Sequence, residues 1–109
     1  MEKEVFDAYL YDFYGDLLGE KQKRLYEASR FQDLSLSEIA ENEGISRQGV
    51  HDLLKRTEGK LVEYEEKLRL VERFFKAGER LDLLAEKTPA IQAEVKEIKE
   101  ILFGEMNGI

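Results

Sequence analysis

The chain has 109 residues, of which 42% are hydrophobic and 38% are charged, and its formal net charge is −7. The absence of cysteine excludes disulfides and cysteine-ligated metal sites, and the acidic N-terminus lacks the apolar segment of a signal peptide. No stretch reaches the roughly 20 apolar residues that span a bilayer, so we expect no membrane segment. The lack of cysteine suits a reducing compartment, and we expect a cytoplasmic protein.

The first third of the chain has the spacing of two amphipathic helices. Apolar residues recur three and four positions apart from Val5 to Leu18, with a break expected near Gly15. A second helix is expected over Glu20–Phe31, with Phe31 among its buried residues. No segment alternates apolar and polar residues as a half-buried strand does, so the pattern predicts an all-α fold.

The middle of the chain has the pattern of two short-linked helices. Ser35 and Glu38 have the spacing of a capping box at the start of the first helix. Gly44 suits the left-handed conformation that ends this helix, and Ser46 can cap the next one. The inward positions are apolar, namely Ile39, Ala40, Ile45, Val50, Leu53 and Leu54. These offsets predict a sigma-region-like helix-turn-helix with its core over residues 36–56.

The second helix of this motif is predicted to continue well past the motif, from Ser46 to Phe75. At 1.5 Å per residue such a helix would be about 45 Å long. Its apolar residues recur with the 4-3 spacing of a heptad stripe: Val50, Leu54, Thr57, Leu61, Tyr64, Leu68, Val71 and Phe75. Because this helix would outrun the small domain before it, its second half must bury the stripe elsewhere.

A last helix is predicted after Thr88 and Pro89, with the threonine as N-cap, the proline at the first helical position and Gly104 at the end. Its apolar stripe consists of Ile91, Val95, Ile98 and Leu102. The chain is thus expected to form a helix-turn-helix domain over residues 1–60 and a helical extension over residues 61–109. Pairing of the two stripes within one chain is one solution. The amount of apolar surface favours pairing across a twofold axis in a homodimer, and docking on another protein is the alternative.

The acidic net charge is unevenly distributed. Residues 1–45 hold 11 acidic and 5 basic residues, a net charge of −6. Residues 46–60 hold Asp52 and Glu58 against Arg47, Lys55, Arg56 and Lys60, a net charge of +2. This basic stretch coincides with the second helix of the motif, which is the recognition helix of a DNA-binding helix-turn-helix.

Six polar residues on this helix are the candidate nucleic-acid contacts: Ser46, Arg47, Gln48, His51, Lys55 and Arg56. Arginine suits the O6 and N7 atoms of guanine, and glutamine suits the N6 and N7 atoms of adenine. The alternative is that these side chains only solvate an outer helix face, and Asp52 on the same face opposes phosphate binding. Gly49 either permits close backbone approach or has no role.

No catalytic or metal-binding pattern accompanies the motif. His51 is the only histidine, and the chain has no serine–histidine–aspartate spacing, phosphate loop or H-E-x-x-H motif. We therefore expect that the protein is not an enzyme and that it binds no metal and no cofactor.

The run Leu34–Glu41, followed by Gly44–Val50, resembles the DNA-binding end of bacterial sigma factors. More closely it resembles the YlxM family, small bacterial proteins encoded beside the signal recognition particle GTPase. The resemblance covers roughly residues 9–70 and includes Tyr11–Leu18 and Tyr64–Leu68. It implies a sigma-like helix-turn-helix fold and a regulatory part in the signal recognition particle pathway, with components of that particle as possible partners.

Together these patterns favour a helix-turn-helix regulatory protein that contacts nucleic acid, either DNA or structured RNA. The alternative is a protein–protein adaptor of the same pathway that has lost nucleic-acid binding. In that case the acidic N-terminal half would meet a basic partner.

Overall fold

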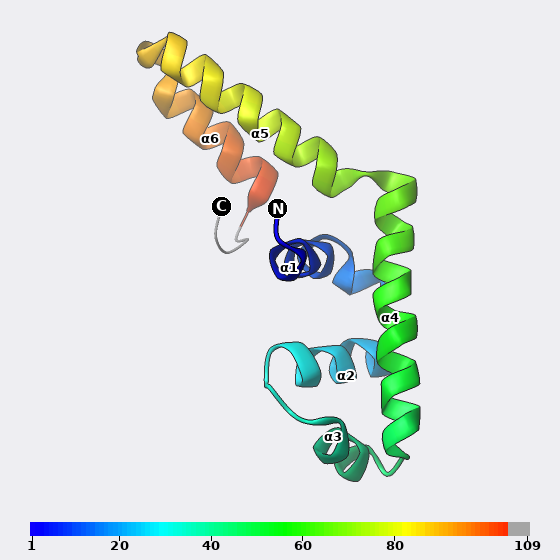
Figure 1. Ribbon diagram of the computed structural model, residues 1–109. Helices are drawn as coiled ribbons and strands as arrows, with labels where there is room; N and C mark the ends of the chain where they lie inside the picture. The colour runs from blue at the N-terminus through cyan, green and yellow to red at the C-terminus, as the bar shows by residue number, and fades with distance from the viewer. Residues whose placement is uncertain (105–109) are drawn as a thin grey trace. The chain divides into compact units, whose positions relative to one another are not determined.

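The computed structural model describes residues 1–104, and all regular secondary structure within them is helical (Figure 1). The predicted all-α fold class is therefore confirmed for this part of the chain. The chain divides into two compact units, one over Met1–Leu68 and one that begins at Arg69. The observed division thus lies after residue 68, whereas the sequence pattern places it after residue 60.

The first unit contains the helix-turn-helix and the two helices before it. Three helices, α1, α2 and α3, lie along one side of α4 and pack against it (Figure 1). Their bounds are Lys3–Tyr14 for α1, Glu20–Arg30 for α2, Leu36–Glu43 for α3 and Arg47–Leu68 for α4, with a short 3-10 turn, η1, at Gly15–Leu17.

The ends of α3 and the start of α4 have the predicted capping interactions. Ser35 Oγ accepts a hydrogen bond from the Glu38 amide at 3.1 Å, and Glu38 Oε1 accepts one from the Ser35 amide at 3.1 Å. Gly44 ends α3 with a φ of 68°, in the left-handed region that favours glycine. Ser46 Oγ accepts a hydrogen bond from the Gly49 amide at 2.9 Å. These contacts fix the angle between the two motif helices.

The core of the motif consists of the residues that the spacing predicts. Leu25 of α2 is buried together with residues of both motif helices, and further apolar side chains pack around them. The buried members from the motif are Ile39, Ala40, Val50 and Leu53, and Leu36, Ile45 and Leu54 pack against them. Phe31 is an exception to the prediction, because it follows the end of α2 and is 54% exposed.

Polar contacts join α1 to the second half of α4. The hydroxyl of the buried Tyr14 donates a hydrogen bond to Glu65 Oε1 at 2.5 Å, and the Tyr14 ring lies 5.9 Å from that of Tyr64. Thr57 is fully buried in the apolar stripe of α4, where its hydroxyl donates to the Leu53 carbonyl at 2.8 Å. Residues up to Glu65 therefore belong to the first unit.

The prediction of one continuous helix from Ser46 to Phe75 is wrong, because the helix is interrupted at a single residue. Arg69 has a φ of 54° and a ψ of 31°, a left-handed conformation that ends α4 and precedes α5. Two members of the heptad stripe are buried within separate units, Leu61 in the first and Val71 in the second. The spacing of the stripe continues across the break, which explains why the pattern did not reveal it.

The second unit is an antiparallel pair of helices (Figure 1). Its elements are α5 over Leu70–Lys87, a 3-10 turn, η2, over Pro89–Ile91 and α6 over Gln92–Phe103. A Cβ at Gly78 would lie 3.3 Å from the Phe103 ring, so the glycine permits the close packing of α5 and α6. Gly104 follows α6 as predicted, but Thr88 makes no side-chain cap and precedes the 3-10 turn instead.

None of the described helices is long and apolar enough to cross a membrane.

Candidate nucleic-acid interface

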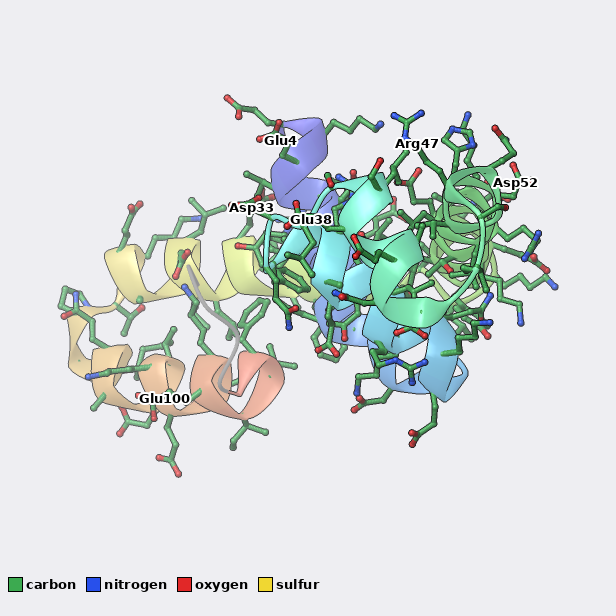
Figure 2. All side chains as sticks on the ribbon, turned by 90° about the horizontal axis from the view of Figure 1, so that it is seen from below. Glu4, Asp33, Glu38, Arg47, Asp52 and Glu100 are labelled. Atoms are coloured by element: carbon green, nitrogen blue, oxygen red, sulfur yellow. The ribbon has the colours of Figure 1, made fainter. Side chains whose placement is uncertain are left out.

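The polar residues at the start of α4 share the helix face opposite its core contacts. Val50, Leu53 and Thr57 are buried on the inner face. Figure 2 shows Arg47 and Asp52 projecting outward from this end of the helix. The exposed residues of the outer face are Arg47, Gln48, His51, Asp52, Lys55 and Arg56. The face spans about 14 Å of helix axis, and a DNA major groove, roughly 12 Å wide, admits a helix of ordinary diameter.

Ser46 and Gly49 build the N-terminal turn of this helix. The Ser46 oxygen is engaged as the cap, so the hydroxyl hydrogen is the group left for an outside acceptor. A Cβ at Gly49 would lie 3.1 Å from Ser46 Oγ and 4.0 Å from Ile45 Cδ1. Gly49 therefore has a local structural role, because a side chain there would crowd the cap.

Asp52 connects two of the predicted base-contacting residues. Gln48 Nε2 donates a hydrogen bond to Asp52 Oδ1 at 2.9 Å, and His51 Nδ1 lies 3.5 Å from the same oxygen. The hydrogen bond from Gln48, followed by that from His51 and the nearby charge of Arg56, lowers the pKa of the Asp52 carboxyl. The side chains of Gln48 and Asp52 thus form a small ordered network on the outer face, which the sequence pattern did not reveal.

Three basic side chains complete this face. Arg47, Lys55 and Arg56 are exposed and form no ion pair within the described residues. Other exposed cations of the first unit are engaged, for example Arg24 with Glu43 at 2.7 Å and Arg30 with Glu58. Unpaired cations on one helix face are the groups that phosphate contacts require.

The same two engaged arginines hold α2 against the motif. Arg24 makes two parallel hydrogen bonds to the Glu43 carboxylate, at 2.7 and 3.0 Å, and so joins α2 to the end of α3. Arg24 is the first cause of the lowered pKa of Glu43. Arg30 joins the end of α2 to Glu58 of α4, and its guanidinium also lies over the Tyr26 ring at 5.6 Å. Sequence reasoning missed both pairs, because their partners are far apart in the chain.

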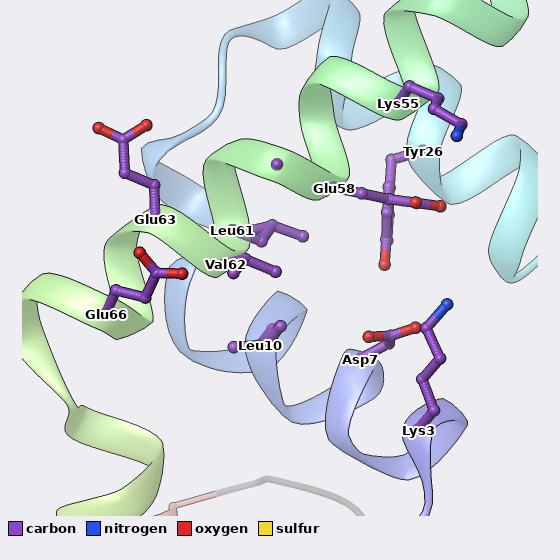
Figure 3. A pocket seen from close by; sticks show the side chains of 11 residues that line it. Lys3, Asp7, Leu10, Tyr26, Lys55, Glu58, Leu61, Val62, Glu63 and Glu66 are labelled. Carbon is purple, nitrogen blue, oxygen red and sulfur yellow. The ribbon is translucent and has the colours of Figure 1, made fainter.

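A groove of about 540 Å³ runs between α1 and α4 (Figure 3). Lys55, a predicted contact residue, lies at one end of it, and Glu63 and Glu66 lie toward the other (Figure 3). Leu10 and Leu61 meet between the two helices. The acidic residues outnumber the basic ones along the groove, so it is poorly suited to phosphate.

The described residues offer no cluster of metal ligands. They contain no group of three or more histidine, aspartate or glutamate side chains that could hold a metal ion. The carboxylates with lowered pKa values, such as Glu38 and Glu43, are engaged in a helix cap and an ion pair. What the outer face of α4 can do chemically is donate and accept hydrogen bonds and attract anions.

Comparisons with known proteins point to one family. The model of the UPF0122 family, described as "Putative helix-turn-helix protein, YlxM / p13 like", matches residues 1–101. A UPF0122 protein of Shouchella clausii is 46% identical over 94 residues, which cover 86% of this chain and 84% of that protein. One of Halalkalibacterium halodurans is 44% identical over 102 residues, covering 94% and 93%. One of Thermoanaerobacter sp. is 50% identical over 78 residues, covering 72% and 67%.

Proposed function

This chain belongs to the UPF0122 family of YlxM / p13-like helix-turn-helix proteins, and we propose that it is a regulatory protein that binds nucleic acid through the start of α4. One observation carries the proposal: Arg47, Lys55 and Arg56 are exposed on the outer face of the second motif helix and form no ion pair within the described residues. The proposed contact residues are Ser46, Arg47, Gln48, His51, Lys55 and Arg56.

Duplex DNA is the first expectation for the ligand, and structured RNA is the second. A helix-turn-helix places its second helix in the major groove, with the N-terminal residues of that helix at the base edges. Gln48 and His51 are then nearest the bases, whereas Arg47, Lys55 and Arg56 contact phosphates or guanine.

Binding of random-sequence duplex DNA and of a hairpin RNA at several salt concentrations tests the proposal. Replacing Arg47 and Lys55 by alanine should weaken binding and reduce the salt slope by about one unit per lost phosphate contact. The control variant replaces Arg73 and Lys87, which removes the same charge from the second unit. An unchanged slope in the first variant, or an equal loss in the control, contradicts the proposed surface.

The family resemblance also supports a finer assignment. The protein is proposed to act in the cytoplasm, without catalytic activity, as a regulator in the signal recognition particle pathway. Purification of the tagged protein from cytosol, with and without nuclease, tests this role. Recovery of the particle's GTPase or RNA supports it, and recovery of neither contradicts it.

A homodimer built by the second unit is part of the proposal. Four large apolar side chains of α5 and α6 are at least 44% exposed in the single chain: Leu83, Leu84, Ile98 and Ile101. Their burial would contribute roughly 25 cal/mol per Å². Sedimentation equilibrium at micromolar concentration should give twice the 12.7 kDa chain mass, reduced to one chain mass by Leu84→Glu and not by Lys87→Glu. A monomeric wild-type protein would rule the homodimer out.

The second candidate function is an adaptor that binds a basic protein. The net charge of −6 over residues 1–45 favours it. Saturable binding of a basic partner, together with no binding of DNA or RNA, would support the adaptor in place of the nucleic-acid regulator.

A further inference from the structure

Asp52 lies in the middle of the α4 face to which we assign nucleic-acid binding, and a carboxylate there repels phosphate groups. It is also the only acidic residue among residues 44–57. Its negative charge is therefore an exception within this basic stretch, and its contacts suggest a reason.

Asp52 fixes the position of a neighbouring side chain. Gln48 lies one turn before it, and Gln48 Nε2 donates to Asp52 Oδ1 at 2.9 Å. Both side chains are exposed, so the bond is not a by-product of burial in the core. A glutamine side chain that is free in water samples many rotamers, and ordering it on binding costs side-chain entropy.

The hydrogen bond leaves the recognition groups of Gln48 available. A carboxamide has two N–H donors and one oxygen acceptor, and Asp52 uses one donor. The second N–H and Oε1 remain, which is the pair that binds the N7 and N6 atoms of adenine in the major groove.

We propose that Asp52 is a positioning residue that holds the Gln48 carboxamide ready to recognise adenine in duplex DNA. The inference rests on the proposed function and narrows it to DNA, because the major groove of A-form RNA is too deep and narrow for side chains to read. Asp52 acts through Gln48 and makes no base contact of its own.

The experiment selects bound sequences from duplex DNA with a randomised central segment of about one helical turn, ~10 base pairs. The full chain is compared with Gln48→Ala, Asp52→Ala and Asp52→Asn. The asparagine oxygen can still accept from Gln48, so Asp52→Asn removes the charge and keeps the hydrogen bond. Glu63→Ala is the matched control, because it removes one negative charge from an exposed position of the same helix.

Wild-type protein should prefer adenine at one position of its site. Gln48→Ala and Asp52→Ala should each reduce that preference by about fivefold or more. About fivefold is the lower end of the discrimination that one bidentate base contact provides. The double variant, which combines Gln48→Ala with Asp52→Ala, should lose no more of the preference than either single variant, since both residues act on one contact. Asp52→Asn and Glu63→Ala should keep the preference within about twofold, and Asp52→Asn should raise the overall affinity because a negative charge is gone.

Three results would overturn the inference. The first is an adenine preference that persists in Asp52→Ala. The second is a loss in Asp52→Asn equal to that in Asp52→Ala, which would show that the charge itself matters. The third is a preference for cytosine in the wild-type protein that is lost in Asp52→Ala, which would mean that Asp52 accepts a hydrogen bond directly from a base.

A measurement on the free protein separates this inference from the proposed function. In NMR spectra the Gln48 side-chain amide protons should differ from those of the exposed Gln32, and the difference should vanish in Asp52→Ala and remain in Asp52→Asn. Absence of the difference in wild type overturns the positioning role whatever the protein binds. If the difference is present but the protein binds hairpin RNA and not duplex DNA, the inference is overturned and the proposed function stays intact. If the protein binds neither nucleic acid, both are overturned.

Discussion

The two units of the chain bury their apolar residues to very different extents. The first unit has a core to which α2, α3 and α4 all contribute, and hydrogen bonds and ion pairs connect α1 and α2 to α4. In the second unit, the described residues that are buried are only Val71, Gly78, Val95 and Phe103. Four large apolar side chains of the same two helices stay about half exposed or more. The first unit therefore has a core shared by several helices, whereas the second buries few apolar residues in the single chain.

This difference explains where each proposed interaction lies. A recognition surface must be rigid, and the start of α4 is fixed by a capped turn and by a core on its inner face. An association surface must offer apolar area, and α5 and α6 supply it. The predictions below test this contrast.

The largest effect is expected from separating the units. A fragment of residues 1–68 should keep a cooperative thermal transition, because its core lies entirely within it. A fragment of residues 69–109 should lose most of its helix at low micromolar concentration, since a chain of about 40 residues is at the size limit for a sufficient core of its own. Circular dichroism measures both. If the second fragment is a stable, helical monomer, the two units do not differ in their ability to fold alone.

Shortening a core side chain of the first unit should lower the free energy of unfolding far more than shortening an exposed apolar side chain of the second unit. Ile39→Ala removes a side chain that is 2% exposed and should lower the free energy of unfolding by about 2–5 kcal/mol. Ile101→Ala, at a side chain that is 76% exposed, should change it by less than about 0.5 kcal/mol in the monomer. Urea unfolding gives both values, and comparable losses would show that the two units are packed alike.

A smaller effect is expected at the turn of the motif. Gly44→Ala places a Cβ on a residue with a φ of 68° and should cost about 1–2 kcal/mol of stability. The matched change Gly59→Ala lies within α4, where no atom apart from its chain neighbours and the nearby backbone of the same helix lies within 4 Å of the new Cβ. It should stabilise the protein by about 0.5–1 kcal/mol. Opposite signs in thermal unfolding would confirm the turn geometry, and a neutral Gly44→Ala would contradict it.

The smallest effect is expected from acid. The Ser35 cap lowers the pKa of Glu38, and Arg24 lowers the pKa of Glu43. Because the folded state holds these pKa values below their unfolded values, the stabilisation is present at pH 7 and is lost as the pH falls below about 4.5. Thermal melts from pH 7 to pH 3 should show the loss, and the double variant Glu38→Gln, Glu43→Gln should show a shallower one. An equally steep decline in the variant would assign the effect to other groups.

Local signals in the sequence were sufficient for the helix-turn-helix. The capping box at Ser35, the left-handed Gly44 and the inward Ile39 and Val50 all lie within a few residues of the groups they contact. The break at Arg69 was missed because arginine gives no sign of a left-handed conformation and the apolar spacing continues across it. The burial of Phe31 was predicted wrongly, since the helix ends one residue earlier and the ring is left half exposed.

The sequence predicts which residues share the outer face of α4, but not the hydrogen bonds among their side chains. The positions of Arg47, Gln48 and Lys55 opposite the buried stripe follow from helical periodicity, and the structure places them there. The bond from Gln48 to Asp52 depends on two side-chain rotamers that periodicity does not specify. Whether these residues bind nucleic acid stays a prediction for the salt and selection experiments.

The division of the chain after residue 68 has a consequence for synthesis. Each unit is one continuous segment of helices, a topology of low contact order that favours fast folding. Domains of a growing chain fold as they leave the ribosome, the N-terminal one first. The helix-turn-helix can therefore be complete while α6 is still being translated, and its recognition face is formed before the apolar surface of the second unit emerges.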